Sequence, residues 1–262
     1  MIESKRRRKL NREESIVFNR EKEGYGKTIE QYTRLKDNIL CFGVDGKKVI
    51  QVESSIEQEG KTTTSANLAV ALGASGKKVV VIDFDFARGC LHRLFLMENQ
   101  NGINDYIIGK IDKEKLIKKT EFENVDLITR GHSVKSSSII FTSQKMKDLL
   151  EELRKEYDFI ILDCPPVNLV SDYLHISRLA DGVLFVVAYG LTKKKFVSEA
   201  VRLMRSNNMN IIGSVFTYYD PKISSTYYDY NGSYYYYYYN KEKEEVNDDS
   251  NDGSLEEKNK KE

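Results

Sequence analysis

The sequence predicts an α/β fold, in which a mostly parallel β-sheet carries helices on both of its faces. Continuous apolar runs such as Val79–Asp83 and Phe159–Asp163 are typical of strands that are buried on both sides. Between such runs lie longer segments that favour helices, among them an alanine-rich stretch over Lys61–Ser75 that ends at Gly76. Strands that alternate with helices form right-handed βαβ units, and these units build a parallel sheet.

The individual elements follow one another regularly along the chain. The pattern predicts strands at Lys48–Glu53, Val79–Asp83, Val125–Thr129, Phe159–Asp163, Gly182–Ala188 and Ile211–Phe216. It predicts helices at Lys61–Ser75, Ser143–Glu156 and Lys193–Ser206. All of these segments belong to one predicted domain, residues 28–217.

The two ends of the chain differ from this domain in charge and in tyrosine content. The net charge of +1 is an average, because residues 1–12 hold six basic residues and one acid, whereas residues 241–262 hold five lysines and nine acids. Eleven of the 17 tyrosines lie between Tyr218 and Tyr239. A polar, charged end cannot bury enough apolar surface to order itself. We therefore predict a basic flexible segment over residues 1–27 and a disordered, tyrosine-rich tail over residues 218–262.

The composition also excludes several classes of protein. Near-zero net charge gives no reason to expect nucleic-acid binding, which usually accompanies a basic excess. The longest uninterrupted apolar run, Val183–Ala188, is far shorter than the roughly 20 residues of a membrane-spanning helix, and no secretory h-region follows the basic start. The three cysteines lack CxxC spacing, which fits a reducing cytosol better than a zinc site or a disulfide framework.

A Gly-Lys-Thr motif between the first strand and the first helix predicts a phosphate-binding loop of the P-loop NTPase type. At such a junction, backbone N–H groups and a helix N-terminus point at phosphate oxygens. Lys61 is expected to reach the β- and γ-phosphates of ATP, and the Thr62 hydroxyl to bind Mg²⁺. The standard motif opens with glycine six residues before the lysine, where this chain has Ser55. The residues predicted to bind the nucleotide are Ser55, Glu59, Gly60, Lys61, Thr62 and Thr63.

Carboxylates end two of the predicted buried strands, at the edge of the sheet where doubly wound folds bind ligands. Asp83 and Asp85 are two residues apart, so an extended backbone points both the same way; one can engage Mg²⁺ while the other accepts a proton. Asp163 ends the predicted strand Phe159–Asp163 in the arrangement of a Walker B motif. The predicted metal ligands are Thr62, Asp83 and Asp163. The predicted catalytic residues are Lys61, Asp83, Asp85 and Asp163, with Asp85 as the base.

The tyrosine cluster has two interpretations. It is either low-complexity sequence, with the aggregation tendency of an edge strand, or a set of phosphoacceptors. A strand has no need of six adjacent tyrosines, since half of them would face water, whereas a mobile segment after a nucleotide-binding domain can display phenols to an active site. The predicted phosphoacceptors are Tyr227, Tyr228, Tyr230, Tyr234, Tyr235, Tyr236, Tyr237, Tyr238 and Tyr239.

Together these segments resemble the cytoplasmic domain of the bacterial tyrosine autokinases (BY-kinases) that regulate capsule and exopolysaccharide synthesis. The resemblance covers roughly residues 28–239, including SANLAVALGASGKKVVVIDFD after the loop, YDFIILDCPPV at Tyr157–Val167 and the tyrosine tail. It implies ATP and Mg²⁺ as cofactors and autophosphorylation of the tail. It also implies a homo-oligomer and a transmembrane activator of the polysaccharide co-polymerase type, which would hold a stand-alone cytoplasmic kinase at the inner face of the membrane.

The chain departs from the family's pattern at several positions. In the loop, the usual threonine, proline and glycine are replaced by Glu53, Glu57 and Gln58. The arginine expected after the second aspartate is Ala87, followed by Arg88, and the adenine-recognising asparagine after the last strand is Thr217. The early Glu-x-x-Arg-x-x-Arg assembly motif appears as Glu30, Thr33 and Lys36. The sequence therefore indicates a divergent member.

Phosphorylation of the tail between subunits is the leading hypothesis, and two alternatives remain beside it. A partitioning ATPase of the MinD or ParA type would use the same loop and aspartates, but carries a second lysine where this chain has Ile56. A weakly active, ATP-sensing assembly partner would fit the substituted positions. The basic start is either a solvated tail or a contact with anionic lipid.

Overall fold

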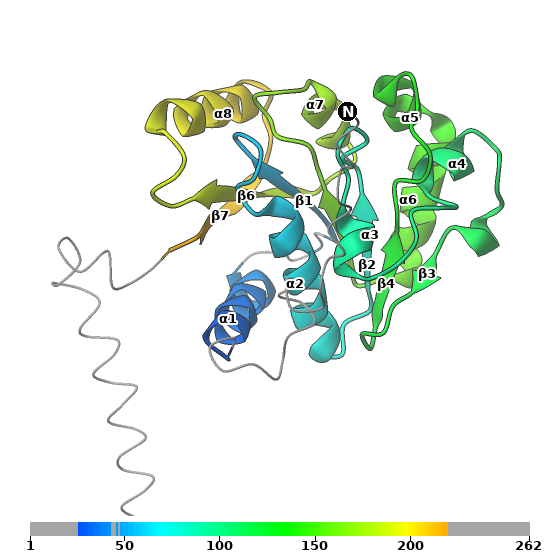
Figure 1. Ribbon diagram of the computed structural model, residues 1–262, viewed down its shortest axis with the longest axis horizontal. Helices are drawn as coiled ribbons and strands as arrows, with labels where there is room; N and C mark the ends of the chain where they lie inside the picture. Colours follow the sequence, from blue (N-terminus) through cyan, green and yellow to red (C-terminus); the bar gives the residue numbers. More distant parts are fainter. Residues whose placement is uncertain (1–25, 43–45, 47, 220–262) are drawn as a thin grey trace, which may run out of the picture. The chain divides into compact units, whose positions relative to one another are not determined.

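The computed structural model describes residues 26–42, 46 and 48–219. Within this part, one seven-stranded sheet has the strand order β3-β4-β2-β5-β1-β6-β7 (Figure 1). Its strands are β1 (Val49–Ser54), β2 (Val79–Asp83), β3 (Lys118–Lys119), β4 (Val125–Ile128), β5 (Phe159–Asp163), β6 (Gly182–Ala188) and β7 (Ile211–Thr217). Every neighbouring pair is parallel except β3 with β4, so the predicted α/β fold with a mostly parallel sheet is confirmed.

The helices of the described residues lie between the strands in sequence. They are α1 (Gly26–Phe42), α2 (Lys61–Ala74), α3 (Leu91–Leu94), α4 (Ile103–Ile107), α5 (Ser137–Thr142), α6 (Gln144–Glu156), α7 (Asp172–Ile176) and α8 (Lys194–Ser206), with a 3₁₀ turn, η3, at Lys113–Lys115. None of these helices is long and apolar enough to cross a membrane. Residues 1–25 of the predicted flexible segment and residues 220–262 of the predicted tail lie outside the described residues, whereas residues 26–27 begin α1.

Helices cover both faces of the sheet, as the alternation of elements predicts. Along β2, Val80 and Ile82 pack with α5 and α6 in one apolar cluster, whereas Val79 and Val81 pack with α1, α2 and α3 in another. Figure 1 shows α1 and α2 together on one side and α5 and α6 on the other. A third cluster joins α8 to β6. Strand residues therefore need apolar side chains in both directions, which explains the continuous apolar runs in the sequence.

Most predicted elements agree with the structure to within one residue at each end. The long helix α1 was not predicted, although Tyr32, Leu35 and Ile39 recur at helical spacing and face α2. The two-residue strand β3 was also missed, because Lys118 and Lys119 carry no apolar pattern. β3 runs antiparallel to β4 and forms the edge of the sheet. Neither addition changes the fold class.

Asp181, just before β6, holds three elements together at the N-terminal edge of the sheet. Its carboxylate accepts hydrogen bonds from the backbone N–H groups of Lys48 and Val49, both at 2.8 Å. Arg154 at the end of α6 donates two more, at 2.6 and 2.7 Å. Partial burial alone would raise the pKa of Asp181, but these hydrogen bonds lower it below its usual value. The hydrogen bonds from Lys48, Val49 and Arg154 therefore favour the ionised form of Asp181 over its protonated form.

Asp181→Ala should lower the free energy of unfolding at neutral pH by about 2 kcal/mol, since charged hydrogen bonds to two elements are lost. A carboxylate whose pKa is lowered by folding stabilises above its unfolded pKa and loses that contribution as the pH falls. The difference from wild type should therefore shrink below about pH 4. Urea unfolding at pH 7 and pH 3 measures this, with the exposed Glu151→Ala as the control. An equal loss at both pH values would contradict this account.

Candidate functional site

The loop between β1 and α2 has a fixed shape that Glu59 maintains. One carboxylate oxygen of Glu59 accepts hydrogen bonds from the Ser55 hydroxyl at 2.8 Å and the Ile56 N–H at 2.7 Å. The other accepts from the Thr192 hydroxyl at 2.5 Å and the Ala188 N–H at 3.3 Å. Glu59 is fully buried, so its carboxylate shapes the loop from inside and ties it to the end of β6.

Gly60 follows Glu59 and is the N-cap of α2. Its φ of 90° lies in the left-handed region, which glycine adopts without a Cβ penalty. The Gly60 carbonyl accepts the first hydrogen bond of the helix, from the Thr64 N–H at 2.8 Å. The N–H groups before Thr64, at the helix N-terminus, therefore have no intrahelical partners. This is the geometry that the Gly-Lys-Thr motif predicts for a phosphate loop.

Lys61, the first residue of α2, lies beside the carboxylate of Asp163 at the end of β5. Asp163 is fully buried, and burial raises its pKa to about 6, against the opposing effects of Lys61 and the Thr62 and Ser65 hydroxyls. The Ser65 hydroxyl donates to one Asp163 oxygen at 3.1 Å. The other oxygen is buried and has no hydrogen-bond partner among the described residues. The site therefore holds a carboxylate oxygen that is available to a ligand.

Asp83 is the neighbour of Asp163 across the sheet, because the two residues are paired in the register of β2 and β5. Burial, and then the nearby carboxylates of Asp163 and Asp85, raise the pKa of Asp83 well above its usual value. Its two oxygens accept from the backbone N–H groups of Asp85 and Leu91, each at 3.2 Å. Asp85 is half-buried and accepts from the Arg88 N–H at 2.8 Å. The predicted site residues Lys61, Asp83, Asp85 and Asp163 thus converge.

These donors fit a Mg²⁺ ion that arrives with a nucleotide. Mg²⁺ usually binds one or two carboxylates together with phosphate oxygens and water, rather than a cage made of protein alone. Asp83 and Asp163 offer two buried carboxylates of raised pKa, and the Thr62 hydroxyl lies beside Asp163. Within the described ranges, no group of three or more His, Cys, Asp or Glu side chains is arranged to hold a metal alone.

The end of β7 lies against the same loop. The Thr217 hydroxyl donates to the Glu59 carbonyl at 2.7 Å, and the Tyr218 hydroxyl donates to the Gln58 carbonyl at 3.4 Å. Thr217 occupies the position at which the resemblance to BY-kinases implies an adenine-recognising asparagine. In this chain, the Thr217 hydroxyl donates its hydrogen bond to the loop. Gln58 has a φ of 63°, a left-handed conformation at a position where the resemblance has glycine. The predicted phosphoacceptors, Tyr227 to Tyr239, lie outside the described residues.

Sequence reasoning missed several residues of this site. Ser65 lies four residues after Lys61, one helical turn along α2, and that spacing could have indicated it. Thr192 and Ala188 contact Glu59 from a segment more than a hundred residues away, so no local pattern could have found them. Gly89 was also missed; it packs directly against Asp83.

Gly89→Ala should weaken Mg²⁺-dependent nucleotide binding by about 10-fold. A Cβ at this position would lie 2.4 and 2.6 Å from the two Asp83 oxygens, so the carboxylate must move. Displacing a ligating group by about 1 Å is enough to cost this much or more. Titration with MgATP measures the effect. Gly213→Ala is the control, because its added Cβ would meet only Leu184 Cδ1, at an ordinary contact distance of 3.9 Å. Unchanged binding in Gly89→Ala would contradict the placement of Asp83 at the metal.

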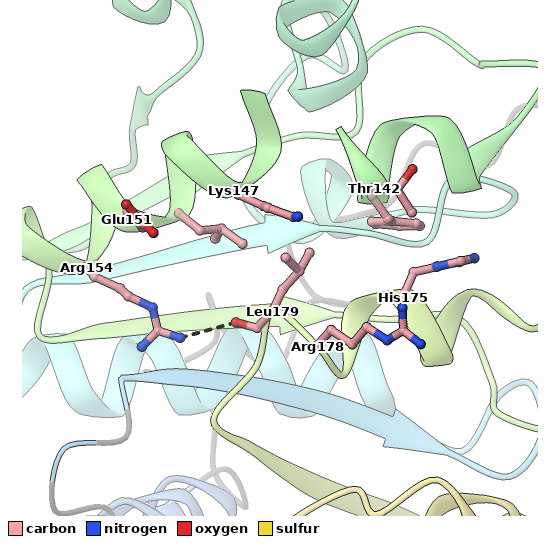
Figure 2. Close-up of a pocket in the computed structure, with 9 residues that line it drawn as sticks. Thr142, Lys147, Glu151, Arg154, His175, Arg178 and Leu179 are labelled. Atoms are coloured by element: carbon pink, nitrogen blue, oxygen red, sulfur yellow. Dashed lines mark hydrogen bonds between the residues drawn. The ribbon is translucent and has the colours of Figure 1, made fainter. Parts of the chain in front are cut away.

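A cavity of about 510 Å³ lies apart from these residues, between α5, α6 and the segment around α7 (Figure 2). Figure 2 shows the Arg154 guanidinium, which donates to the Leu179 carbonyl at 3.2 Å, on one wall. The cavity is lined by Phe141, Thr142, Lys147, Leu150, Glu151, Arg154, His175, Arg178 and Leu179. None of the predicted nucleotide-site residues is among them, so the cavity is separate from the candidate site.

Known proteins are similar to this chain in both sequence and fold. Residues 47–191 match the family model described as AAA domain. The chain is 31% identical over 187 residues to tyrosine-protein kinase YwqD of Bacillus subtilis, covering 71% of this chain and 79% of YwqD. It is 30% identical over 204 residues to the putative tyrosine-protein kinase CapB of Staphylococcus aureus, covering 78% and 90%.

Among solved structures, the crystal structure of the chimerical protein CapA2B2 superposes with a TM-score of 0.72 and 28% sequence identity. The match covers 77% of this chain and 88% of that chain. These similarities agree with the phosphate loop and the paired aspartates that this chain has at one edge of its sheet. The chain belongs to the bacterial tyrosine-kinase (BY-kinase) family and has the P-loop NTPase fold of its AAA domain.

Proposed function

We propose that this protein is an ATP-dependent protein-tyrosine kinase that phosphorylates its own C-terminal tyrosine cluster between subunits. One observation carries the choice of the tail as the substrate: β7, the strand that leads toward the cluster, ends on the phosphate loop itself. Thr217 and Tyr218 both donate to loop carbonyls. Tyr227 follows nine residues after Tyr218, so at about 3.3–3.6 Å per extended residue it stays within about 30 Å of that contact. The tail therefore begins where the transferred phosphate would be.

Each residue of the site has a separate role in the proposed phosphoryl transfer. The loop and the α2 N-terminus hold the phosphates, and Lys61 neutralises negative charge on them. Thr62, Asp83 and Asp163 would hold Mg²⁺, which would supply further charge neutralisation. A tyrosine phenol of pKa about 10 is protonated at neutral pH, and Asp85 is the carboxylate that accepts its proton. The chemistry consists mainly of positioning and electrostatics, for which buried, fixed groups are suited.

An assay of two products tests this proposal. The protein is incubated with MgATP, alone and with a peptide from the cytoplasmic end of a membrane activator, and both phosphotyrosine and free phosphate are measured. Phosphotyrosine on the tail is the expected result. Free phosphate without phosphotyrosine would indicate a partitioning-type ATPase, and neither product would indicate an ATP-sensing assembly partner. Either of these results would overturn the kinase proposal.

A mixing experiment tests transfer between subunits. The acceptor is full-length Lys61→Met protein, which keeps its tail and loses the loop lysine. The enzyme is a full-length variant in which the nine predicted phosphoacceptors, Tyr227 to Tyr239, are phenylalanine. Phosphotyrosine on the acceptor is expected in the mixture and in neither protein alone. If only the unmixed wild type is phosphorylated, transfer occurs within one chain instead.

The wider setting follows from the same family membership. We propose that the kinase regulates the synthesis of a capsular or extracellular polysaccharide and works in the cytoplasm, at the inner face of the membrane, with a transmembrane activator of the polysaccharide co-polymerase type. Each phosphate adds about −1.5 to −2 charges to a tail that is already acidic at residues 241–262. Repulsion between phosphorylated tails would separate the subunits of a homo-oligomer. The basic residues 1–12, which lie outside the described residues, would add a contact with anionic lipid.

A further inference from the structure

Three glutamates lie in or beside the loop that is proposed to hold a polyanion. Glu53 lies near the end of the buried strand β1, and Glu57 and Glu59 belong to the loop itself. The only basic residue from Glu53 to Lys61 is Lys61. A carboxylate near phosphate oxygens repels them, and such like-charge contacts are costly. The loop can bind a nucleotide only if the charge of each glutamate is removed or balanced. The structure shows how this is done for all three.

Two of the glutamates are balanced inside the protein. Glu59 accepts four hydrogen bonds from loop and β6-side donors and is fully buried. Glu53 is also fully buried, accepts from the Gln51 side-chain amide at 2.7 Å, and has a second oxygen without a partner within the described chain. Burial raises the pKa of Glu53 well above its usual value, which favours the neutral form of the group. Neither glutamate presents a free charge to the loop.

Glu57 is different, because it is on the open side of the loop and forms an ion pair with Arg88. Arg88 comes from the segment between β2 and α3, on the aspartate side of the site. Its N–H donates to Asp85 at 2.8 Å, and the next residue, Gly89, packs against Asp83. Cys90 in the same segment lies 3.9 Å from the Thr62 hydroxyl. The ion pair therefore joins the phosphate loop to the segment that carries the predicted base, across the edge of the nucleotide site.

We propose that Arg88 is a positioning residue that enables the loop to bind a nucleotide by neutralising Glu57, not by contacting phosphate. This inference rests on the proposed function, since it takes MgATP as the ligand of the loop. The side chains of Arg88 and Glu57 are 70% and 36% exposed, and an ion pair of this exposure contributes little to folding. Its effect is local: without Arg88, the Glu57 charge would face the incoming phosphates.

A double-mutant cycle tests the inference. The dissociation constant of the non-hydrolysable analogue AMPPNP with Mg²⁺ is measured by calorimetry for the full-length wild type, Arg88→Gln, Glu57→Gln and the double variant. Arg88→Gln should bind about 10-fold more weakly, which is about 1.4 kcal/mol. Glu57→Gln should bind as well as wild type or better. The double variant should return to within about twofold of Glu57→Gln, because the charge that Arg88 balances is gone.

Three further measurements separate this charge effect from a structural one. The melting temperature without nucleotide should be the same for all four proteins. The defect of Arg88→Gln should shrink as salt rises from 0.05 to 0.5 M, since screening shortens the reach of an exposed charge. The matched control is Arg202→Gln, which breaks an exposed ion pair with Glu199 on α8 and should leave nucleotide affinity unchanged.

Three results would overturn the inference. If Arg88→Gln binds as well as wild type, Glu57 needs no partner. If the 10-fold defect persists in the Glu57→Gln background, Arg88 acts by touching the nucleotide. Binding is measured without phosphoryl transfer, so a protein that binds the analogue but forms no phosphotyrosine would refute the proposed kinase activity and leave this test valid. A wild type that does not bind the analogue would refute both.

Discussion

Replacing Lys61 with methionine should abolish phosphotyrosine formation and weaken MgATP binding by at least about 100-fold, while the fold is retained. Lys61 is buried beside the carboxylates of Asp163 and Glu53, and its charge lowers the pKa of both. The substitution therefore removes a cation from the phosphates and also raises the pKa of Asp163 further above 6. A higher pKa favours the protonated form of Asp163, which binds Mg²⁺ less well. Loss of one preorganised electrostatic group commonly costs 10²–10³ in rate.

The measurements for Lys61→Met are phosphotyrosine formation, calorimetric binding of MgATP and circular dichroism. Methionine keeps the length of the side chain, so the far-ultraviolet spectrum should match that of wild type. Lys155→Met, on the exposed face of α6, is the matched control and should behave as wild type in all three. Undiminished phosphotyrosine in purified Lys61→Met would contradict the assignment of this loop as the active site.

Asp163→Asn should have two large effects of opposite sign: a loss of Mg²⁺-dependent nucleotide binding and a gain in stability without nucleotide. Burial raises the pKa of Asp163 from 3.8 to about 6, and it is paired in register with Asp83, whose pKa is also raised. A carboxylate whose pKa is raised by folding costs stability progressively as the pH rises from its unfolded to its folded pKa. Asparagine does not ionise, so it avoids this cost.

The gain should therefore be absent at pH 4 and reach about 3 kcal/mol at pH 8, from about 1.4 kcal/mol per pKa unit. Urea unfolding at the two pH values measures it, with the exposed Asp148→Asn on α6 as the control. Binding of MgATP should weaken by about 100-fold, whereas the weak binding of ATP without Mg²⁺ should change little. A variant that is less stable than wild type at both pH values would show that Asp163 serves the fold and not the ligand.

The sequence predicted best those elements whose structure follows from the pattern of adjacent residues along the chain. The strands β2, β5 and β6 are apolar on both sides, and their bounds agree with the structure. Because parallel strands end at one edge, the convergence of Asp83 and Asp163 on Lys61 also followed from the order of the elements. The pairing of Glu57 with Arg88 could not be predicted, since it depends on where two loops meet in space.

Sequence reasoning also treated Glu59 as a nucleotide-binding residue without seeing what its side chain does. Its partners Ala188 and Thr192 come 129 and 133 residues later in the chain, and nothing in the local pattern links them to the loop. The helix α1 was overlooked for a different reason: its apolar residues are sparse, and only its contact with α2 gives them a buried side. Local patterns thus indicated the ligand-facing residues, and the supporting contacts required the folded chain.

The hydrogen bonds of Glu59 have a consequence for the thermodynamics of nucleotide capture. The Glu59 carboxylate binds Ser55 and Ile56 within the loop and Thr192 and Ala188 outside it. The loop has therefore lost much of its conformational freedom before the ligand arrives. Nucleotide binding then causes little further loss of conformational entropy in the loop, because the loop is already ordered when the protein folds. Glu59→Ala should shift that cost to the binding step, so that calorimetry would show a less favourable binding entropy for the same phosphate contacts.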